Sequence, residues 1–536
     1  MKSLDLLLPV ILLLNLPDFP QNFVKQSTGG KEVSEVNDAA LDITPVIFIP
    51  GTMGSPLYDD VNNNNRLTLD EKAWFGPEFL HIRLAENGID PAGNYNIKVS
   101  PLRNDPSNTL RDELNMIPMD LYKGFFDNLE ANDYILDNYD SNHNQGENLF
   151  CFTYDWRKNN TTTAQLLSDF IDSVKEWTGA AKVNIIGHSM GGTVSKTCIN
   201  IFDKSRIKNM VFIGAPHLGA PEVLTVMLKG KLFEWLGFYI DEALVRSLAR
   251  NFPALYQLIP SMNYFNLDLH NNVSTDIEVY NECLQIPNGS YTNYSEMIEY
   301  LKIYESSFGE DLNDALIDSS EIFKESISNV DFGNIQVFNI VGYNKLTIGK
   351  NRIRVIPPLN IIVIEESRNL NGDYTVPVRS AEIINDHVFE NTYYIPNIIH
   401  SALPSSQQVL EILLGVFSDP PVTNFPQYST PPLSYKTIIT DVKIDPEIPK
   451  FFFLSQNYPN PFNPTTNFEF QLPEFERVSL SVYDLLSNKI ATIVDEELPA
   501  GAYKYHWNAS GLASGVYFYR FQVRSFIETK QMILLK

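Results

Sequence analysis

Residues 187–191, with the sequence Gly-His-Ser-Met-Gly, constrain the fold more than any other part of the chain. They have the G-x-S-x-G pattern of a nucleophile elbow, in which a serine occupies a strained turn between a strand and a helix. The apolar run 183–186 precedes the pattern, and the small and apolar residues of 190–202 can form the helix that follows. We therefore predict that Ser189 is a nucleophile on a strand–turn–helix unit. The alternative interpretation is an ordinary turn before a helix.

Other segments alternate between strand and helix around this elbow. Apolar and amphipathic patterns predict strands at 45–49, 150–154, 183–186 and 210–213, and helices at 162–177 and 190–202. This order is typical of an α/β fold, in which helices cover a parallel sheet. Ligands bind such sheets beyond the carboxyl ends of the strands. The residues that follow the predicted strands there are Gly51, Asp155, Ser189 and His217.

A serine hydroxyl is a weak nucleophile near neutral pH. Ser189 therefore needs a histidine to accept its proton and a carboxylate to orient that histidine. In proteins with this elbow, the acid and then the histidine follow the serine in the chain. Asp373 lies in a turn after a strand, and His400 lies between strand 393–395 and helix 407–416. We predict that Asp373 and His400 complete a catalytic triad with Ser189.

Four further residues compete for these roles. Asp386 is the weaker candidate for the acid, and Asp373 itself could serve only to cap its turn. His387 precedes the last predicted strand and is interpreted as a surface histidine. His188 and His217 precede the acid in the chain, so we expect them to line the pocket.

A tetrahedral oxyanion needs two donors, one of which is the backbone N–H after the nucleophile. That residue is Met190, and Thr52 in the glycine-containing loop 50–54 is the candidate for the second. The alternative for this loop is a tight turn that only requires glycine. Met53, beside Thr52, is expected to contact substrate together with His217. This chemistry requires no metal and no cofactor, and we expect none.

The chain of 536 residues is long enough for two or three domains. We expect the α/β domain to span 40–418, with a largely helical insertion at about 218–332 that forms a cap over the site or a separate helical subdomain. A Pro-rich linker is expected at 419–450. Short alternating runs separated by Gly and Asn turns predict a small β-sandwich over 451–536.

Charge and cysteine content narrow the possible partners. The net charge is −25, and residues 450–536 hold eight basic and eight acidic residues, so the excess lies in 1–449. This charge would repel nucleic acid and anionic membranes, and we expect no nucleic-acid partner. Three cysteines cannot form a disulfide framework.

Lys2 and the apolar run 6–14 suggest a signal peptide over 1–25, the alternative being a hydrophobic N-terminal helix.

Five motifs together resemble one family. In chain order and spacing over roughly residues 44–416, they are similar to the lecithin:cholesterol acyltransferase family, which includes phospholipid:diacylglycerol acyltransferases and the lysosomal phospholipase. The motifs are Phe-Ile-Pro-Gly-Thr-Met-Gly-Ser at 48–55, Tyr-Asp-Trp-Arg at 154–157, Gly-His-Ser-Met-Gly-Gly at 187–192, Gly-Ala-Pro-His-Leu-Gly at 214–219 and Gly-Asp-Tyr-Thr-Val-Pro at 372–377. The resemblance implies an α/β-hydrolase fold with a cap, an acyl-enzyme on Ser189, and Asp373 and His400 in the triad. For Asp155 and Arg157 we expect a structural ion pair.

The C-terminal module resembles a second known element. The sequence Leu-Ser-Gln-Asn-Tyr-Pro-Asn-Pro-Phe-Asn-Pro-Thr-Thr at 454–466 and the run Ser-Gly-Val-Tyr-Phe-Tyr at 514–519 are similar to the type IX secretion system sorting domain of the Bacteroidetes group. This resemblance implies interaction with the type IX machinery and a secreted or cell-surface location in a bacterium. The alternative is a carbohydrate-binding β-sandwich that uses Trp507 and nearby tyrosines.

These features together predict a secreted serine-dependent lipid-ester hydrolase, similar to a lipase or phospholipase, or an O-acyltransferase. Its partners would be a lipid ester and, for transfer, an acceptor alcohol. The competing hypothesis is a non-catalytic surface protein that binds lipid or glycan on a hydrolase scaffold. A complete triad in the expected chain order weighs against that hypothesis.

Overall fold

A computed structural model of the chain describes residues 44–59, 84, 97–109, 122–137, 146–231, 242–266, 284–286, 293–304, 311–356, 361–432 and 452–536. Short gaps interrupt these ranges at 56, 100–103, 106–107, 455–456, 458–459, 473–475, 486–487, 499–500 and 525. The predicted signal peptide lies outside the described residues. Among the described residues, no helix combines the length and the apolar character needed to cross a membrane.

A six-stranded parallel sheet forms the centre of the α/β domain. Its strands lie in the order β15, β10, β8, β7, β1, β6. Their bounds are Val46–Ile49 for β1, Leu149–Cys151 for β6, Val183–His188 for β7, Ile207–Ile213 for β8, Gln336–Tyr343 for β10 and Thr392–Pro396 for β15. Strands β1, β6 and β7 are buried along their whole length, because helices cover both faces of the sheet.

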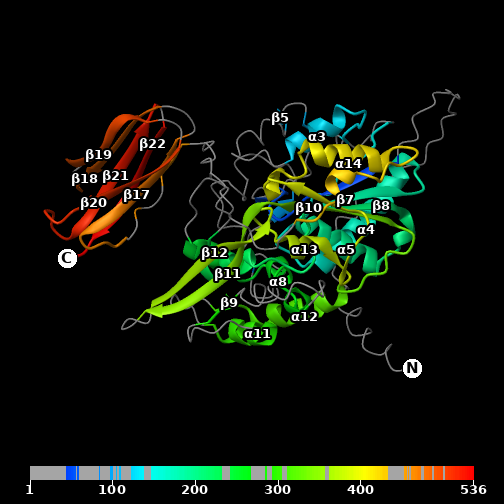
Figure 1. Ribbon diagram of the computed structural model, residues 1–536, viewed down its shortest axis with the longest axis horizontal. Coiled ribbons are helices and arrows are strands. Elements are labelled where there is room, and N and C mark those ends of the chain that lie inside the picture. The colour runs from blue at the N-terminus through cyan, green and yellow to red at the C-terminus, as the bar shows by residue number, and fades with distance from the viewer. Residues whose placement is uncertain are drawn as a thin grey trace. The chain divides into compact units, whose positions relative to one another are not determined.

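The two faces of the sheet lead into two separate hydrophobic cores. Val46 and Phe48 of β1 pack in the core beneath α3 (Lys123–Glu130) and α14 (Gln407–Phe417). Ile47 and Ile49 point the other way, into the core beneath α4 (Asn160–Thr178) and α5 (Met190–Ile201). Figure 1 shows these two helical layers on opposite sides of the sheet. This three-layer arrangement with an elbow after β7 is the α/β-hydrolase fold that the sequence predicts.

Helices dominate the chain between β8 and β10, as expected of the insertion at about 218–332. They are α6 (Glu222–Lys229), α7 (Glu242–Ala249), α8 (Pro253–Gln257), α9 (Met262–Asn266), α11 (Tyr294–Ile303) and α12 (Asp314–Ser326), with a short strand β9 (Leu284–Gln285). The segment 232–241 lies outside the described residues.

A long β-hairpin follows β10, and the sequence analysis does not predict it. Its strands β11 (Lys345–Ile356) and β12 (Ile361–Gly372) pair antiparallel, with a register irregularity between Thr347 and Lys350. Lys, Arg and Glu are interspersed along both strands, and these charges obscure the alternation on which strand prediction relies. Strand β12 leads directly to Asp373.

The α/β domain continues past residue 418, where the sequence analysis places the start of a linker. Phe425 is buried, and its ring lies 5.5 Å from that of Tyr393 in β15. The Tyr393 hydroxyl donates a hydrogen bond to the Thr423 carbonyl. The described segment up to about Tyr428 therefore belongs to the α/β domain, because it fills the core beneath α14.

The C-terminal residues form two antiparallel sheets around a core of their own. One sheet contains β16 (Phe453–Leu454), β17 (Thr465–Leu472) and β20 (Gly501–Asn508). The other contains β18 (Glu476–Tyr483), β19 (Lys489–Leu498), β21 (Gly515–Val523) and β22 (Phe526–Leu534). Side chains from both sheets share one hydrophobic cluster, which makes this unit the predicted β-sandwich.

Candidate active site

Ser189 occupies a strained turn between β7 and α5. Its backbone has φ 54° and ψ −128°, a conformation that L-residues rarely adopt. The neighbouring glycines permit this turn, because a Cβ on Gly191 would clash with the carbonyl oxygens of Ile49 and Pro50. The Ser189 N–H donates to the Ile213 carbonyl at 3.0 Å, which ties the elbow to β8. This geometry is that of a nucleophile elbow.

Asp373 and His400 are buried and are joined by two hydrogen bonds, one between their side chains and one between their backbones. His400 Nδ1 lies 2.7 Å from Asp373 Oδ2, and the His400 N–H donates to the Asp373 carbonyl, also at 2.7 Å. The second carboxylate oxygen accepts from the backbone N–H groups of Thr375 and Val376 at 3.1 and 2.7 Å. An ionised carboxylate can only accept, so Nδ1 of His400 carries a proton, and in the neutral imidazole the lone pair is at Nε2.

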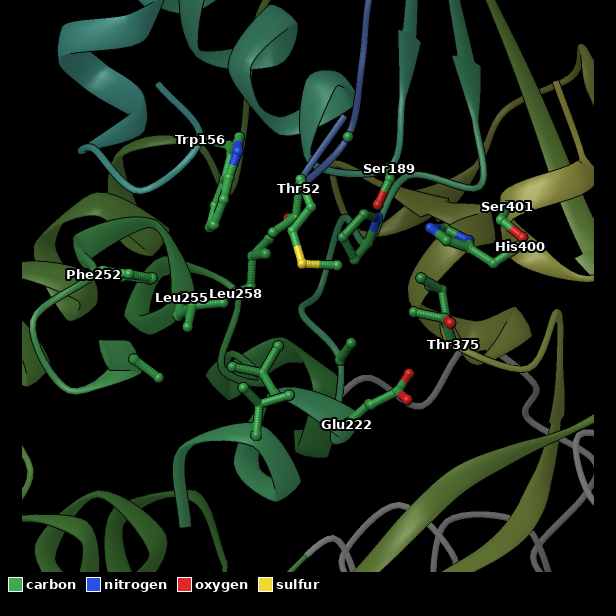
Figure 2. A pocket seen from close by; sticks show the side chains of 18 of the residues that line it. Thr52, Trp156, Ser189, Glu222, Phe252, Leu255, Leu258, Thr375, His400 and Ser401 are labelled. Atoms are coloured by element: carbon green, nitrogen blue, oxygen red, sulfur yellow. The ribbon is translucent and has the colours of Figure 1, made fainter. Parts of the chain in front are cut away.

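The free nitrogen of His400 and the Ser189 hydroxyl open onto the same cavity. Figure 2 shows the two side chains near each other at one end of it. Among the described residues, neither Ser189 Oγ nor the buried His400 Nε2 has a hydrogen-bond partner. Catalytic hydrogen bonds are often open without substrate and tighten in its presence. The fold thus brings together all three residues predicted for the triad.

The turn after β1 faces the elbow. A Cβ on Gly51 would lie 2.7 Å from Ser189 Cβ, and Thr52 Oγ1 lies 3.5 Å from Met190 Sδ. The backbone N–H groups of Thr52 and Met190 bond to no other residue in the part of the chain that the structure describes. Both are therefore available as donors beside the serine, as an oxyanion site requires.

Tyr122 and His188 link this turn to His400. The Gly51 N–H donates to the Tyr122 hydroxyl at 3.0 Å, and that hydroxyl lies 2.8 Å from His188 Nδ1. His188 Nε2 lies 3.1 Å from the His400 carbonyl, which can only accept, so Nε2 carries the proton. Burial, and next the nearby His400, lower the pKa of His188 far below its usual value. A neutral His188 must then accept the Tyr122 proton at Nδ1.

We expect Tyr122→Phe to lower kcat about tenfold with KM within about twofold of wild type. Loss of the hydroxyl leaves the Gly51 N–H and His188 Nδ1 buried without a partner, which costs about 1–3 kcal/mol of stability. It also breaks the hydrogen-bonded link between the turn at Gly51 and the His400 backbone. Steady-state ester hydrolysis and a thermal melt measure both effects. A variant with a lower Tm but unchanged kcat would contradict the positioning role.

The cavity beyond the serine is strongly apolar. Val223 and Val226 of α6, Val245, Leu248 and Ala249 of α7, and Phe252, Leu255 and Leu258 line it, together with Met53 and Trp156. Figure 2 places Trp156, Phe252, Leu255 and Leu258 across the cavity from His400. Apart from the buried Glu222, which Figure 2 labels in this cavity, few polar groups there would need hydrogen bonds, so an uncharged aliphatic chain matches the lining.

The remaining predicted residues lie in several places. Met53 lines the cavity at Ser189. His217 lines a different cavity, because the turn after Ala215 packs its ring against that of Phe212, with the ring centroids 4.7 Å apart. Asp386 and His387 are exposed and away from the triad. Arg157 is buried and forms a two-point ion pair with Asp155, which confirms the structural pair.

Tyr122, the α7 side chains and Thr375 are cavity residues that the sequence analysis missed. Tyr122 stands 66 positions before His188, in a polar stretch without periodicity. The α7 residues carry only a generic amphipathic pattern, which any surface helix shares. Thr375 stands two residues after Asp373, and this closeness to the predicted acid is the one sequence signal that could have placed Thr375 at the cavity.

Two family models match the chain. Residues 121–341 match the model described as Lecithin:cholesterol acyltransferase, and residues 456–535 match Secretion system C-terminal sorting domain. Both resemblances expected from the motifs are confirmed over these segments. A curated relative, lecithin-cholesterol acyltransferase-like 4 of Arabidopsis thaliana, is 26% identical over 306 residues, which cover 54% of this chain and 52% of the relative. The chain thus spans about half the length of that relative.

Solved structures show looser similarity. The Tle4–Tli4 complex contains a chain that is 13% identical with a TM-score of 0.46, covering 71% of this chain and 99% of that one. The mature form of Bacillus licheniformis lipase BlEst2 is 11% identical with a TM-score of 0.33, covering 72% of this chain and 96% of that one.

The sorting domain indicates export to a secreted or cell-surface location, which confirms the predicted localisation.

Proposed function

We propose that this chain, whose residues 121–341 match the lecithin:cholesterol acyltransferase family, is a serine-dependent lipid-ester hydrolase acting through an acyl-enzyme on Ser189. One observation carries the proposal. The buried Asp373–His400 pair presents a free Nε2 to the cavity into which the strained elbow raises Ser189. A lipid-ester hydrolase or acyltransferase in general is also what the family match supports.

The first half of the reaction follows from this geometry. His400 Nε2 accepts the Ser189 proton as Oγ attacks the ester carbonyl carbon, and the resulting oxyanion accepts hydrogen bonds from the Met190 and Thr52 N–H groups. Asp373 stabilises the imidazolium through Nδ1. When the tetrahedral intermediate collapses, the ester C–O bond breaks and the alcohol leaves with the proton from His400. The acyl group is then bound to Ser189.

The second half decides between hydrolysis and transfer. Water or an acceptor alcohol gives its proton to His400 Nε2 and attacks the acyl carbon. The bond from that carbon to Ser189 Oγ then breaks, His400 returns the proton to Oγ, and a fatty acid or a new ester leaves. The apolar cavity accommodates the acyl chain, and we propose Met53 as one of its contacts. We favour hydrolysis as the second half, and among the described lining residues we identify no acceptor site.

A product analysis tests this assignment. Incubation with an emulsified lipid carrying a labelled acyl chain and about 10 mM of a long-chain alcohol should give labelled fatty acid as the main product. Chromatography separates the acid from the transferred ester. A preponderance of new ester would identify an acyltransferase, and failure to release either product would favour the non-catalytic lipid- or glycan-binding alternative.

The same experiment, repeated on residues 43–432, tests the domain assignment. We propose that the α/β-hydrolase domain retains full turnover of both soluble and emulsified esters without the β-sandwich, because the two have separate hydrophobic cores. The C-terminal unit would then serve export through the type IX machinery. A selective loss on the emulsion would instead assign substrate-surface binding to the β-sandwich.

A further inference from the structure

A second cavity, of about 290 Å³, lies along helix α5 and is distinct from the cavity at Ser189. Thr193 and Lys196, three residues apart on one face of α5, line it. The loop 216–219 and the segment 257–263 contribute further lining. The proposed reaction uses none of these side chains. Pro216 lines both cavities.

Lys196 is the unusual residue of this cavity. Its side chain lines the cavity while the residue is only 3% exposed, and in the described part of the chain no hydrogen bond or ion pair reaches its ammonium group. Burying an unpaired ammonium disfavours folding by several kcal/mol unless another group compensates it. Desolvation lowers the pKa of Lys196 to about 8, against the opposing effect of Asp386.

A neutral group of the same lining also lacks a partner. Ser261 Oγ is a buried atom that bonds to no other described residue, whereas the Asn339 side chain acts as a hydrogen-bond partner of His217. Burial, and next the charge of Lys196, lower the pKa of His217 far below its usual value, so its ring is neutral. Unsatisfied buried polar groups are rare in native proteins, so the unpaired Lys196 and Ser261 Oγ, which line one cavity, point to a missing partner.

The charges around the cavity define what that partner carries. The charged and titratable side chains of its lining, apart from Lys196, are His217, Tyr294, Glu321, Lys324, Glu325 and Asp386. Lys324 is neutralised by Glu321 at 2.8 Å, and Tyr294 donates to the same Glu321. Glu325 and Asp386 are exposed and can be solvated. Lys196 is thus the lining cation that no described ion pair neutralises, and the charge of Asp386 acts on it only through space.

We propose that this cavity binds a small hydrophilic molecule through an oxyanion, a carboxylate or a phosphate, seated on Lys196. The Ser261 hydroxyl then donates to an oxygen of that anion, and a hydroxyl-bearing remainder faces the polar lining. The ammonium, which forms no ion pair with the described residues of the free protein, gains its counter-ion from the ligand. Lipid chains belong to the other, apolar cavity.

Isothermal titration calorimetry on the full chain at pH 7 tests the proposal with two probes, D-gluconate and inorganic phosphate. Sorbitol is the control for gluconate, because it has the same hydroxyl-rich chain without the carboxylate. We expect saturable binding of at least one probe below about 10 mM and none of sorbitol. Binding by gluconate alone would assign a carboxylate ligand, and binding by phosphate alone a phosphate ester or free phosphate.

Two variants test which side chains bind the anion. Lys196→Met should weaken binding by about tenfold or more, and Ser261→Ala by a few-fold, as expected for lost charged and neutral hydrogen bonds. The exposed Lys208→Met makes the same change in net charge and should leave the affinity unaltered. Gluconate affinity should also fall between pH 7 and 9.5 as Lys196 loses its proton, a dependence that Lys196→Met abolishes.

The melting temperature of the probe-free variant provides a second criterion. Folded Lys196 holds its proton more weakly than the unfolded chain does, so at pH 7 its charge opposes folding, and Lys196→Met should melt no lower than wild type. A much lower Tm would indicate a structural lysine and overturn the proposal. Absence of binding by both probes, or equal binding by sorbitol or by Lys196→Met, would overturn it as well.

Discussion

Replacing His400 with alanine should lower kcat/KM for a medium-chain p-nitrophenyl ester by on the order of 10³ or more, because it removes the base that accepts the Ser189 proton in the proposed reaction. The fold should survive the change. Asp373 keeps its hydrogen bonds from the Thr375 and Val376 N–H groups, and the contact of His188 is with the backbone of His400, which the variant retains.

His387→Ala is the matched control. His387 is exposed, bonds only to the Asn385 carbonyl through Nδ1, and stacks on Phe389, so its removal should change kcat/KM by less than about twofold. The double variant Ser189→Ala/His400→Ala should be little worse than either single change, since triad members act as a unit. Loss of activity in His387→Ala with a working His400→Ala would exclude the proposed base.

The triad could be predicted because each member stands at a local signal. The elbow needs glycines on both sides of Ser189, Asp373 follows a strand in a turn, and His400 lies between the last strand and the last helix of the domain. Parallel strands then bring their carboxyl ends to one edge of the sheet. Strand order alone thus assembles residues that are up to 211 positions apart in the chain.

Features that depend on long-range packing were not predictable in this way. The Tyr122 hydroxyl gains its role only from the positions of Gly51 and His188, and no spacing rule joins these three residues. The burial of Phe425 against Tyr393 is equally non-local, so a Pro-rich composition suggested a linker where the α/β domain continues. His217 follows a sheet strand as expected, yet the turn after Ala215 directs it to the second cavity.

Ser189→Ala should reduce turnover by on the order of 10³ or more, with any residual rate due to substrate binding and the oxyanion donors. Alanine tolerates the elbow no worse than serine does, since both carry a Cβ at φ 54° and the glycines that make room for it are unchanged. The Tm should therefore stay within a few degrees of wild type. Near-normal turnover by the alanine variant would mean that the ester is cleaved elsewhere.

The most direct test of the central claim is covalent labelling of the full chain with a fluorophosphonate, followed by intact-mass measurement and peptide mapping. We expect one adduct per chain, located on Ser189, absent from Ser189→Ala and much slower to form in His400→Ala. An adduct on another serine, or equal labelling of Ser189→Ala, would contradict the assignment of Ser189 as the nucleophile.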